Sequence, residues 1–369
     1  MSAAVDTVDK DWPIKHSGHR LSSLCFLILI VLAFAYGMYQ VFSDNLAKGG
    51  IGAWLDGTAE KQLDDKLVLP GYGQFQTLDA AWRYRVLGHL GSQVQQGCPG
   101  WLFYTDGLKS PLANPESVLE QRVRLMKSLA ARLESTRVRL LVVTVPDKSR
   151  VLNDRLCGLH RSVGTQNILP RWHRAVEAQG IPYVSLLESL ATVSDPYYRT
   201  DVHMTQQGAA QAAQAVAAYV KSLVGDSGET DYEISRASRP EQRIGDLLSL
   251  AGLADAPEGW RPVPDVYTPE IFALASSGGL LADDPPLKIL LAGSSNSRRS
   301  NFAEQLSHDL KQPVWNVSRD GGKFADTLSA TLRDRDSWPE SLELVIWEMS
   351  EMSLYTPLTE EEKAALDAL

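Results

Sequence analysis

The chain has 369 residues, of which 44% are hydrophobic and 22% charged, so it is long enough to bury a sizeable core and lacks the composition of a disordered protein. Its formal net charge of -9 argues against nucleic acid as a partner, because phosphate binding needs a concentrated basic face. Three cysteines are too few for a disulfide framework.

The first predicted element is an uncharged apolar run from Leu21 to Tyr39. As a helix it would span roughly 28 Å, close to the hydrocarbon thickness of a bilayer. Lys15 and Arg20 precede it, whereas the nearest charge after it is Asp44. This asymmetry predicts a cytoplasmic N-terminus and export of the rest of the chain.

We therefore expect a cytoplasmic segment at 1–20, a retained transmembrane anchor at 21–39 and a linker rich in small residues at 40–64. A removable signal peptide, cleaved near Ala33-Phe34-Ala35, is the alternative.

Residues 65–369 show the alternation of strands and helices that is typical of an α/β domain. Continuous apolar runs favour buried parallel strands, and the pattern predicts a mostly parallel sheet with helices on both faces. Polar turn formers at 225–246 interrupt the alternation and predict a surface excursion. The expected strands are 138–146, 181–188, a strand beginning at 287, and 342–348; the expected helices are 117–135, 171–179, 206–223 and 302–311.

The strand that begins at Leu287 ends abruptly in glycine and serines, "LKILLAGSSNSRRSNF", before the next helix. Serines commonly form turns and cap helices. One of these hydroxyls could instead be a nucleophile, provided that another part of the chain supplies a base.

His203 is the candidate base, in "YYRTDVHMTQQGAAQAA". Asp201 lies two residues before it, and in an extended segment such positions project to the same side. The carboxylate can then bind one imidazole nitrogen and leave the other free for a hydroxyl. A turn capped by Thr205 that holds a merely polar histidine is the alternative. Metal binding by Asp201 and His203 lacks a third histidine or cysteine at a familiar spacing, so we expect no metal.

Five sequence blocks follow one another along the chain: "GWLFYTDG" (100–107), "VTVPDKSRV" (143–151), "RTDVHMT" (199–205), "LLAGSSNS" (290–297) and "VIWEMSE" (345–351). In this order they resemble the alginate O-acetyltransferase family, which includes cellulose-acetylating relatives. The resemblance covers roughly residues 67–355 and implies an SGNH-hydrolase-like fold with a circularly permuted motif order, in which Asp-x-His precedes the serine. By position, the family's catalytic triad falls on Asp201, His203 and Ser295.

This chain departs from the family's pattern in two places. Met204 stands where the family often has an aromatic residue, which alters a wall of the site rather than its chemistry. The late block continues as "WEMSEMSLY" instead of a Pro-Glu-Arg-like stretch, so we expect no role for it beyond packing.

Several further residues are candidates for oxyanion or substrate binding. The backbone N–H groups of Ser295 and Asn296 are expected oxyanion donors, with Ser294 supporting the turn and Ser297 capping the next helix. Lys148 and Arg298 either hold donor or polymer, or are solvated surface charges. Three other residues have two open roles each: Asn316 as an oxyanion donor or a turn residue, and Trp101 and Tyr104 as sugar-stacking or buried aromatics.

The resemblance implies an acetyltransferase of the bacterial inner membrane, with its catalytic domain in the periplasm. It would move acetyl groups through an acetyl-serine onto hydroxyls of an exported polysaccharide, cellulose or alginate. The implied partners are a membrane-bound O-acyltransferase that supplies acetyl groups and other components of polysaccharide synthesis and export. No nucleotide-binding glycine loop is present in the sequence, so we expect no cofactor.

Two other functions stay open. A deacetylase or esterase would use the same triad with water as the acceptor, and a non-catalytic polysaccharide-binding assembly protein would keep the fold without needing it. The acidic chain favours a neutral glucan such as cellulose over a polyuronate. Cys98 and Cys157 could pair in an oxidising compartment, but the sequence alone does not bring them together.

Overall fold

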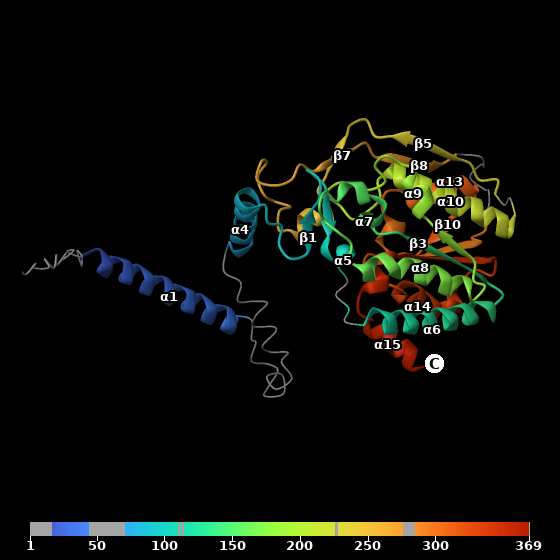
Figure 1. The fold of residues 1–369 in the computed structure, drawn as a ribbon, viewed down its shortest axis with the longest axis horizontal. Helices are drawn as coiled ribbons and strands as arrows, with labels where there is room; N and C mark the ends of the chain where they lie inside the picture. Colours follow the sequence, from blue (N-terminus) through green and yellow to red (C-terminus); the bar gives the residue numbers. More distant parts are fainter. Residues whose placement is uncertain are drawn as a thin grey trace, which may run out of the picture. The chain divides into compact units, whose positions relative to one another are not determined.

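The computed structural model (Figure 1) describes residues 17–43, 71–109, 112, 114–225, 228–275 and 285–368. The chain divides into two units at Gln76, and each is described by itself. In the first unit, helix α1 spans Ser17–Ser43, and its stretch from Leu21 to Tyr39 is long and apolar enough to cross a membrane. The expected anchor is therefore helical, whereas most of the 1–20 and 40–64 segments lies outside the described residues.

A parallel five-stranded sheet with the order β10-β9-β11-β3-β4 organises the second unit. β11 is the central strand of this sheet. β3 and β4 lie on one side of it, and β9 and β10 lie on the other. In such sheets a crevice opens beyond the carboxyl ends of the strands where the order reverses. The bounds are β3 Arg139–Val145, β4 Tyr183–Ser185, β9 Ile289–Ala292, β10 Val314–Asn316 and β11 Leu344–Ser350.

Helices cover both faces of the sheet (Figure 1), as the alternation of elements predicts. Alternate strand residues point to opposite faces, so that Val143 joins the core beneath one helical layer and Val142 the core beneath the other. The first layer contains α10 Gln206–Val224 and α13 Phe302–Leu310; the second contains α6 Pro115–Glu134, α8 Val163–Glu177, α14 Asp326–Arg333 and α15 Glu360–Asp367.

Two predicted boundaries are wrong for identifiable reasons. Helix α8 begins at Val163 instead of after Pro170. Buried apolar residues on either side of this proline, such as Ile168 and Trp172, pack the helix into the core, so Pro170 is tolerated inside it. The strand expected at 181–188 ends at Ser185, and the chain then enters the short helix α9, Leu187–Ala191.

The surface excursion expected at 225–246 carries two antiparallel strand pairs rather than turns alone. It continues well past residue 246 and includes residues that contact the histidine segment, as described below. Its elements are β5 Tyr232–Arg236, β6 Glu241–Arg243, α11 Asp246–Leu250, β7 Asp265–Tyr267 and β8 Glu270–Leu274.

A hairpin and several short helices complete the described part of the second unit. Cys98, in the loop of this hairpin, forms a disulfide with Cys157, with 4.9 Å between the two Cα atoms, so the pairing that the sequence left open is present. The remaining elements are α4 Tyr72–Leu87, which begins before the division at Gln76, and β1 Val94–Gln96, β2 Leu102–Tyr104, α5 Thr105–Leu108, α7 Lys148–Val151, η2 Asn153–Arg155, α12 Ser295–Arg298, η3 Arg335–Ser337 and η4 Glu351–Tyr355.

Candidate active site

Ser295 lies at the first position of α12, in the tight turn that follows β9. Ser294 caps this short helix, and its Oγ accepts from the Asn296 N–H at 3.2 Å. Gly293 is required at the turn because a Cβ there would collide with the carboxylate of Glu348. The turn thus presents the Ser295 hydroxyl at the carboxyl end of the sheet.

Glu348 is a buried carboxylate beneath this turn. Ala292 of β9 pairs with Trp347 of β11, so the next residue of β11 lies beside Gly293. Its carboxylate accepts from the Ser294 N–H at 2.6 Å, the Ser294 hydroxyl at 3.0 Å and the Ser297 hydroxyl at 2.9 Å. Burial raises the pKa of Glu348, and these hydrogen bonds lower it in part. The neighbouring strand therefore holds the turn in place.

His203 reaches the site from the segment before α10, whose N-cap is Thr205 as expected. This segment bends instead of being extended, because Asp201 Oδ1 accepts from the His203 backbone N–H at 3.2 Å. The bend still places the two side chains together, with 2.7 Å between Asp201 Oδ1 and His203 Nδ1. The Ser300 hydroxyl donates to the Met204 carbonyl at 2.6 Å and so links this segment to the serine turn.

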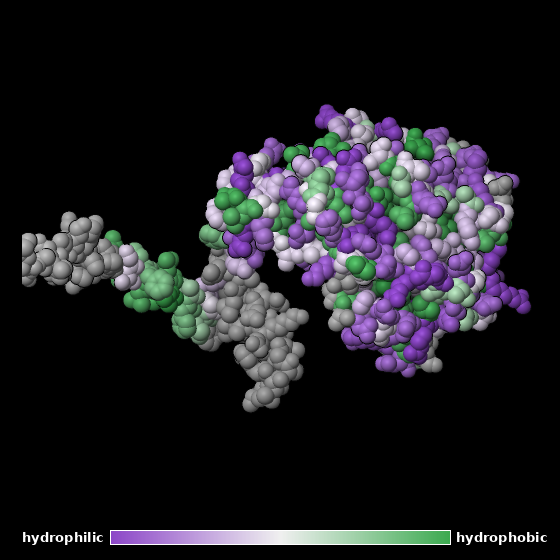
Figure 2. Space-filling view, viewed as in Figure 1, coloured by the Kyte–Doolittle hydropathy of each residue, from purple (hydrophilic) through white to green (hydrophobic). Residues whose placement is uncertain are grey.

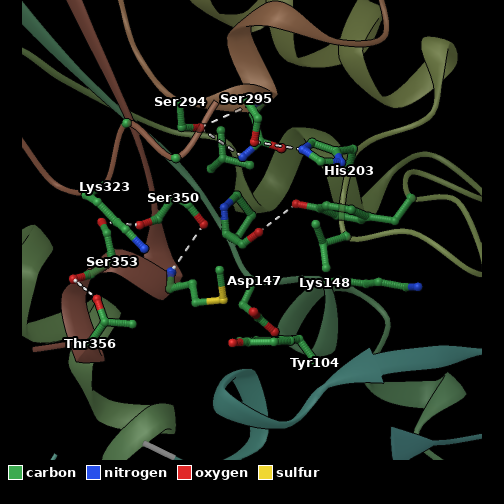
Figure 3. Close-up of a pocket in the computed structure, with 18 residues that line it drawn as sticks. Tyr104, Asp147, Lys148, His203, Ser294, Ser295, Lys323, Ser350, Ser353 and Thr356 are labelled. Atoms are coloured by element: carbon green, nitrogen blue, oxygen red, sulfur yellow. Dashed lines mark hydrogen bonds between the residues drawn. The ribbon is translucent and has the colours of Figure 1, made fainter. Parts of the chain in front are cut away.

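The three side chains form a continuous hydrogen-bonded line. His203 Nε2 lies 2.7 Å from Ser295 Oγ, and the dashed line in Figure 3 marks this contact. Asp201 and His203 are both buried. With Nδ1 facing a carboxylate, the tautomer protonated at Nδ1 leaves Nε2 able to accept the serine proton.

Arg243 of β6 closes the line on its far side, since its Nε lies 2.7 Å from Asp201 Oδ2. Its guanidinium also lies over the Tyr198 ring, 4.7 Å from the centroid. Burial by itself would raise the pKa of Asp201, but the hydrogen bonds and charges of His203 and Arg243 outweigh it and hold that pKa well below its usual range. Asp201 is therefore ionised at neutral pH.

Lys148 is a buried support for neighbouring backbone, so it fits neither of the two expectations, a solvated surface charge or a group that holds donor or polymer. Its ammonium donates to the carbonyls of Leu102 at 2.7 Å, Arg199 at 2.8 Å and Asp201 at 3.0 Å. These three bonds use all its protons, so it has none left for donor or polymer. Figure 3 shows the side chain pointing away from the cavity. Burial lowers its pKa to about 7.

A cavity of about 140 Å³ opens beside Ser295 and His203. Its wall includes Tyr104, so this aromatic residue does face the candidate site, whereas Trp101 is buried in the core. The rest of the wall combines apolar side chains, such as Val145, Val202 and Met352, with the polar side chains of Asp147, Ser350, Ser353, Thr356 and Lys323.

The other candidate residues have different positions. Arg298 pairs with Asp320 at 3.3 Å and is not among the residues that line the cavity. Asn316 lies away from the cavity wall as well, because its amide donates to the Ser297 carbonyl and accepts from the Ser318 N–H. Ser297 does not cap the next helix, since its hydroxyl donates to Glu348.

Asn296 lines the cavity, but its backbone N–H is already bonded to Ser294. Its side-chain amide also donates to Ser294 Oγ, at 3.3 Å, and its Oδ1 is buried without a protein partner. The side-chain amide is therefore the group of Asn296 with remaining capacity to contact a ligand.

A match to a known protein family covers the residues of this site. Residues 94–351 match the family described as "SGNH hydrolase-like domain, acetyltransferase AlgX". The chain belongs to this family. The match includes Asp201, His203 and Ser295.

Relatives and solved structures of the same family are similar along most of the chain. A probable alginate O-acetylase AlgJ of Pseudomonas fluorescens is 25% identical over 347 residues, 91% of this chain and 86% of the relative. The alginate biosynthesis protein AlgX of Pseudomonas syringae pv. tomato is 28% identical over 260 residues, 68% of this chain and 53% of the relative. The O-acetyltransferase domain of Pseudomonas putida AlgJ superposes with a TM-score of 0.63 at 20% identity, covering 75% of this chain and 99% of that domain. The SGNH-like fold predicted from the sequence is thereby confirmed.

Sequence reasoning missed the residues that surround this SGNH-like site. Arg243 lies in a polar excursion and carries no local signal. Glu348 did carry one, because it is a charged residue inside an otherwise apolar buried strand. Glu351 was likewise assigned only to packing, yet it accepts from Arg150 and Arg161 at 2.7 Å each. A second carboxylate near the histidine, Asp246 Oδ2 at 3.4 Å from Nδ1, also escaped notice.

Among the described residues, Asp201, His203 and Asp246 form the one cluster with ligand atoms close enough to share a metal ion. Each carboxylate also faces an arginine, Arg243 at 2.7 Å and Arg299 at 3.4 Å respectively. These guanidiniums already neutralise the acidic charge, so the cluster suits a hydrogen-bonded histidine better than a cation.

Proposed function

We propose that the chain is a polysaccharide O-acetyltransferase that works through an acetyl-serine. The observation that carries this proposal is the contact of 2.7 Å between His203 Nε2 and Ser295 Oγ, continued to Asp201. Family membership supports the acetyl group as the transferred unit.

In the first half-reaction, His203 Nε2 takes the hydroxyl proton as Ser295 Oγ attacks the carbonyl carbon of an acetyl donor. The bond between that carbon and the leaving group then breaks, and the leaving group receives the proton from His203. In the second half-reaction, an acceptor hydroxyl gives its proton to His203 and attacks the acetyl-serine. The ester bond to Ser295 breaks, and His203 returns the proton to Ser295 Oγ.

The ionised Asp201 stabilises the imidazolium that forms in each half-reaction. The backbone N–H of Ser295, at the start of α12, and the side-chain amide of Asn296 are the proposed donors to the oxyanion. One such donor is commonly worth roughly 3 kcal/mol of transition-state stabilisation.

The acceptor is proposed to be a hydroxyl of an exported polysaccharide. The names of the relatives favour alginate, which weighs against the preference for a neutral glucan drawn from the chain's net charge. The hydroxyl and charged side chains in the cavity wall, set among apolar ones, suit a sugar acceptor, which has both polar hydroxyls and an apolar ring face.

The location is proposed to be the periplasmic face of the bacterial inner membrane, with α1 as the anchor. The disulfide between Cys98 and Cys157 supports an oxidising compartment. Cytoplasmic acetyl-coenzyme A cannot reach such a site, so a membrane-bound O-acyltransferase is the proposed supplier of acetyl groups. Anchoring beside it raises the effective concentration of the two partners.

Transfer of acetyl groups from an activated acetyl ester to oligosaccharides tests this function. Wild-type protein should become acetylated at Ser295, as detected by mass spectrometry of its peptides, and should acetylate the acceptor. Ser295→Ala and His203→Ala should lose both activities while keeping the fold. His308→Ala is the matched control, because His308 also contacts an aspartate, at 2.9 Å, but lies on α13 away from the cavity wall.

The acceptor panel distinguishes the transferase from its alternatives. Mannuronate oligomers and cello-oligosaccharides test the polymer, and release of acetate without any sugar product would identify an esterase. Full activity of Ser295→Ala would overturn the mechanism.

A further inference from the structure

Helix α4, Tyr72–Leu87, carries an apolar stripe that no described segment covers. Phe75, Leu78, Trp82 and Val86 follow one another at spacings of three and four residues, so they share one face of the helix. All four are exposed, Phe75 at 70% and Trp82 at 51%. Figure 2 shows hydrophobic side chains gathered at the surface over this helix.

The opposite face of α4 fixes the helix to the catalytic unit. Ala81 is 1% exposed in a small core with Leu247 and Leu248, and Tyr84 packs against the same core. The stripe is therefore not the face that packs α4 against the catalytic unit, because the opposite face already makes that contact.

The edges of the stripe are charged. Arg85 lies seven residues after Leu78, nearly two full helical turns, and so borders one edge. Asp79, four residues after Phe75, borders the other edge and pairs there with Arg83 at 2.8 Å. An apolar stripe with aromatic residues and an arginine at its edge is typical of helices that lie in a membrane interface, with the arginine near anionic headgroups.

The covalent connection limits how far α4 can lie from a membrane. Residues 44–71 separate it from the end of α1, and a fully extended chain of that length reaches about 100 Å at most. If α1 spans the membrane, α4 is the first described element of the catalytic unit beyond it, and the bilayer surface is present at high effective concentration.

We propose that the stripe of α4 docks on the lipid surface of the membrane that holds α1, with Trp82 and Phe75 in the interface and Arg85 near anionic phosphates. This inference rests on the proposed anchoring of the chain. It gives the catalytic unit a second membrane contact, which would hold it beside an acetyl donor embedded in the bilayer.

Site-directed spin labelling of the full chain tests the docking. The background is Cys25→Ser, which removes the one free cysteine of the described residues and leaves the disulfide intact. Labels are placed singly at Leu78→Cys and Val86→Cys, and the protein is reconstituted in vesicles of phosphatidylethanolamine and phosphatidylglycerol. Collision with oxygen, which concentrates in lipid, is compared with collision with a water-soluble nickel chelate.

Two control positions calibrate the measurement. Ile30→Cys, in α1, should report lipid, and the exposed Glu120→Cys, in α6, should report water. Docking predicts that both α4 labels resemble Ile30→Cys in their loss of nickel collisions. In Trp82→Ser protein, the Val86→Cys label should move toward the values of Glu120→Cys.

Three results would overturn the docking. The α4 labels could collide freely with nickel in vesicles, or be shielded from both reagents, which would indicate a covering protein segment instead of lipid. A water-accessible Ile30→Cys label would overturn the anchor itself. The labels are read in the same way in Ser295→Ala protein, so a failure of the proposed catalysis is distinguishable from a failure of docking.

Discussion

Glu348→Gln tests whether the position of the nucleophile depends on the buried carboxylate beneath it. Glu348 is 1% exposed and accepts three hydrogen bonds, all from the turn that carries Ser295. Glutamine has nearly the same shape, but one of its two terminal atoms is a donor. It can therefore keep the bond to the Ser294 N–H only by placing its amide nitrogen against a serine hydroxyl.

The expected loss follows from these bonds. Hydrogen bonds to a charged group are worth about 1.5–3 kcal/mol each and neutral ones about 0.5–1.5 kcal/mol. The lost and weakened bonds are partly offset, because glutamine escapes the cost of burying a charge, which also raises the pKa of Glu348. We expect a net decrease of about 2 kcal/mol in the free energy of unfolding.

The expected effect on kcat is larger than the expected effect on stability. A displacement of a reacting group by about 1 Å can cost roughly 100-fold in rate. We therefore expect kcat for acetyl transfer from an activated ester to fall roughly 100-fold in Glu348→Gln, with little change in KM, because the cavity wall is untouched.

Glu362→Gln is the matched control. Glu362 is also buried, its pKa is also raised by burial, and it accepts from Arg122 at 3.2 Å and from the Thr359 N–H at 3.0 Å. It lies on α15 and does not line the cavity. Denaturant titration and steady-state kinetics should show lost stability in both variants but lost kcat only in Glu348→Gln. Equal kcat in Glu348→Gln and wild type, or equal losses in the two variants, would refute the argument.

Three further predictions follow from the same structure. Arg243→Met removes the hydrogen bond to Asp201 Oδ2, so the carboxylate that orients His203 loses a fixed partner; kcat for acetyl transfer should fall by roughly tenfold, with partial return in Arg243→Lys. Burial lowers the pKa of Lys148 to about 7, so between that pH and about 10 the folded state binds fewer protons than the unfolded state. The free energy of unfolding should therefore rise with pH across this window, by up to about 1.4 kcal/mol per pH unit. Urea titrations of Lys148→Met should lack this rise. Replacing Cys98 and Cys157 together by alanine opens a loop with a sequence separation of 59 residues and should cost about 4 kcal/mol of stability; a reductant should lower the Tm of the wild type but not of this variant.

The parts of the fold that the sequence predicted well are those with local causes. The apolar run at 138–146 contains β3, and the run at 342–348 overlaps most of β11, because a strand buried on both faces needs a continuous apolar sequence. Thr205 caps α10 through a bond to Gly208 only three residues away. The serine turn and the histidine segment were identifiable because small polar residues interrupt regular elements there.

Contacts between distant segments were not predictable in the same way. The charge of Lys148 gave no sign of burial, because its three carbonyl partners come from other segments of the chain. Arg243 follows Asp201 by 42 residues, and only the pairing of β6 with β7 brings it to the site. Of the two roles left open for Asn316, the structure supports the turn residue: its Oδ1 accepts from the Ser318 N–H, and its amide donates to the distant Ser297 carbonyl.

The contact between Glu348 and the serine turn could have been predicted from the sequence with one further step. In a buried strand, alternate residues share a face, so Glu348 had to point to the same side as Ile346 and Leu344, toward the layer of α10. A carboxylate there must find hydrogen-bond donors or leave a charge unpaired, at a cost of several kcal/mol. The nearest chain with unpaired donors is the serine turn, once β9 is placed beside β11. The late block therefore contains, in Glu348, a residue whose position is dictated by the turn of the nucleophile. The departure from the family's pattern lies beyond Glu348, in the wall of the cavity around Met352.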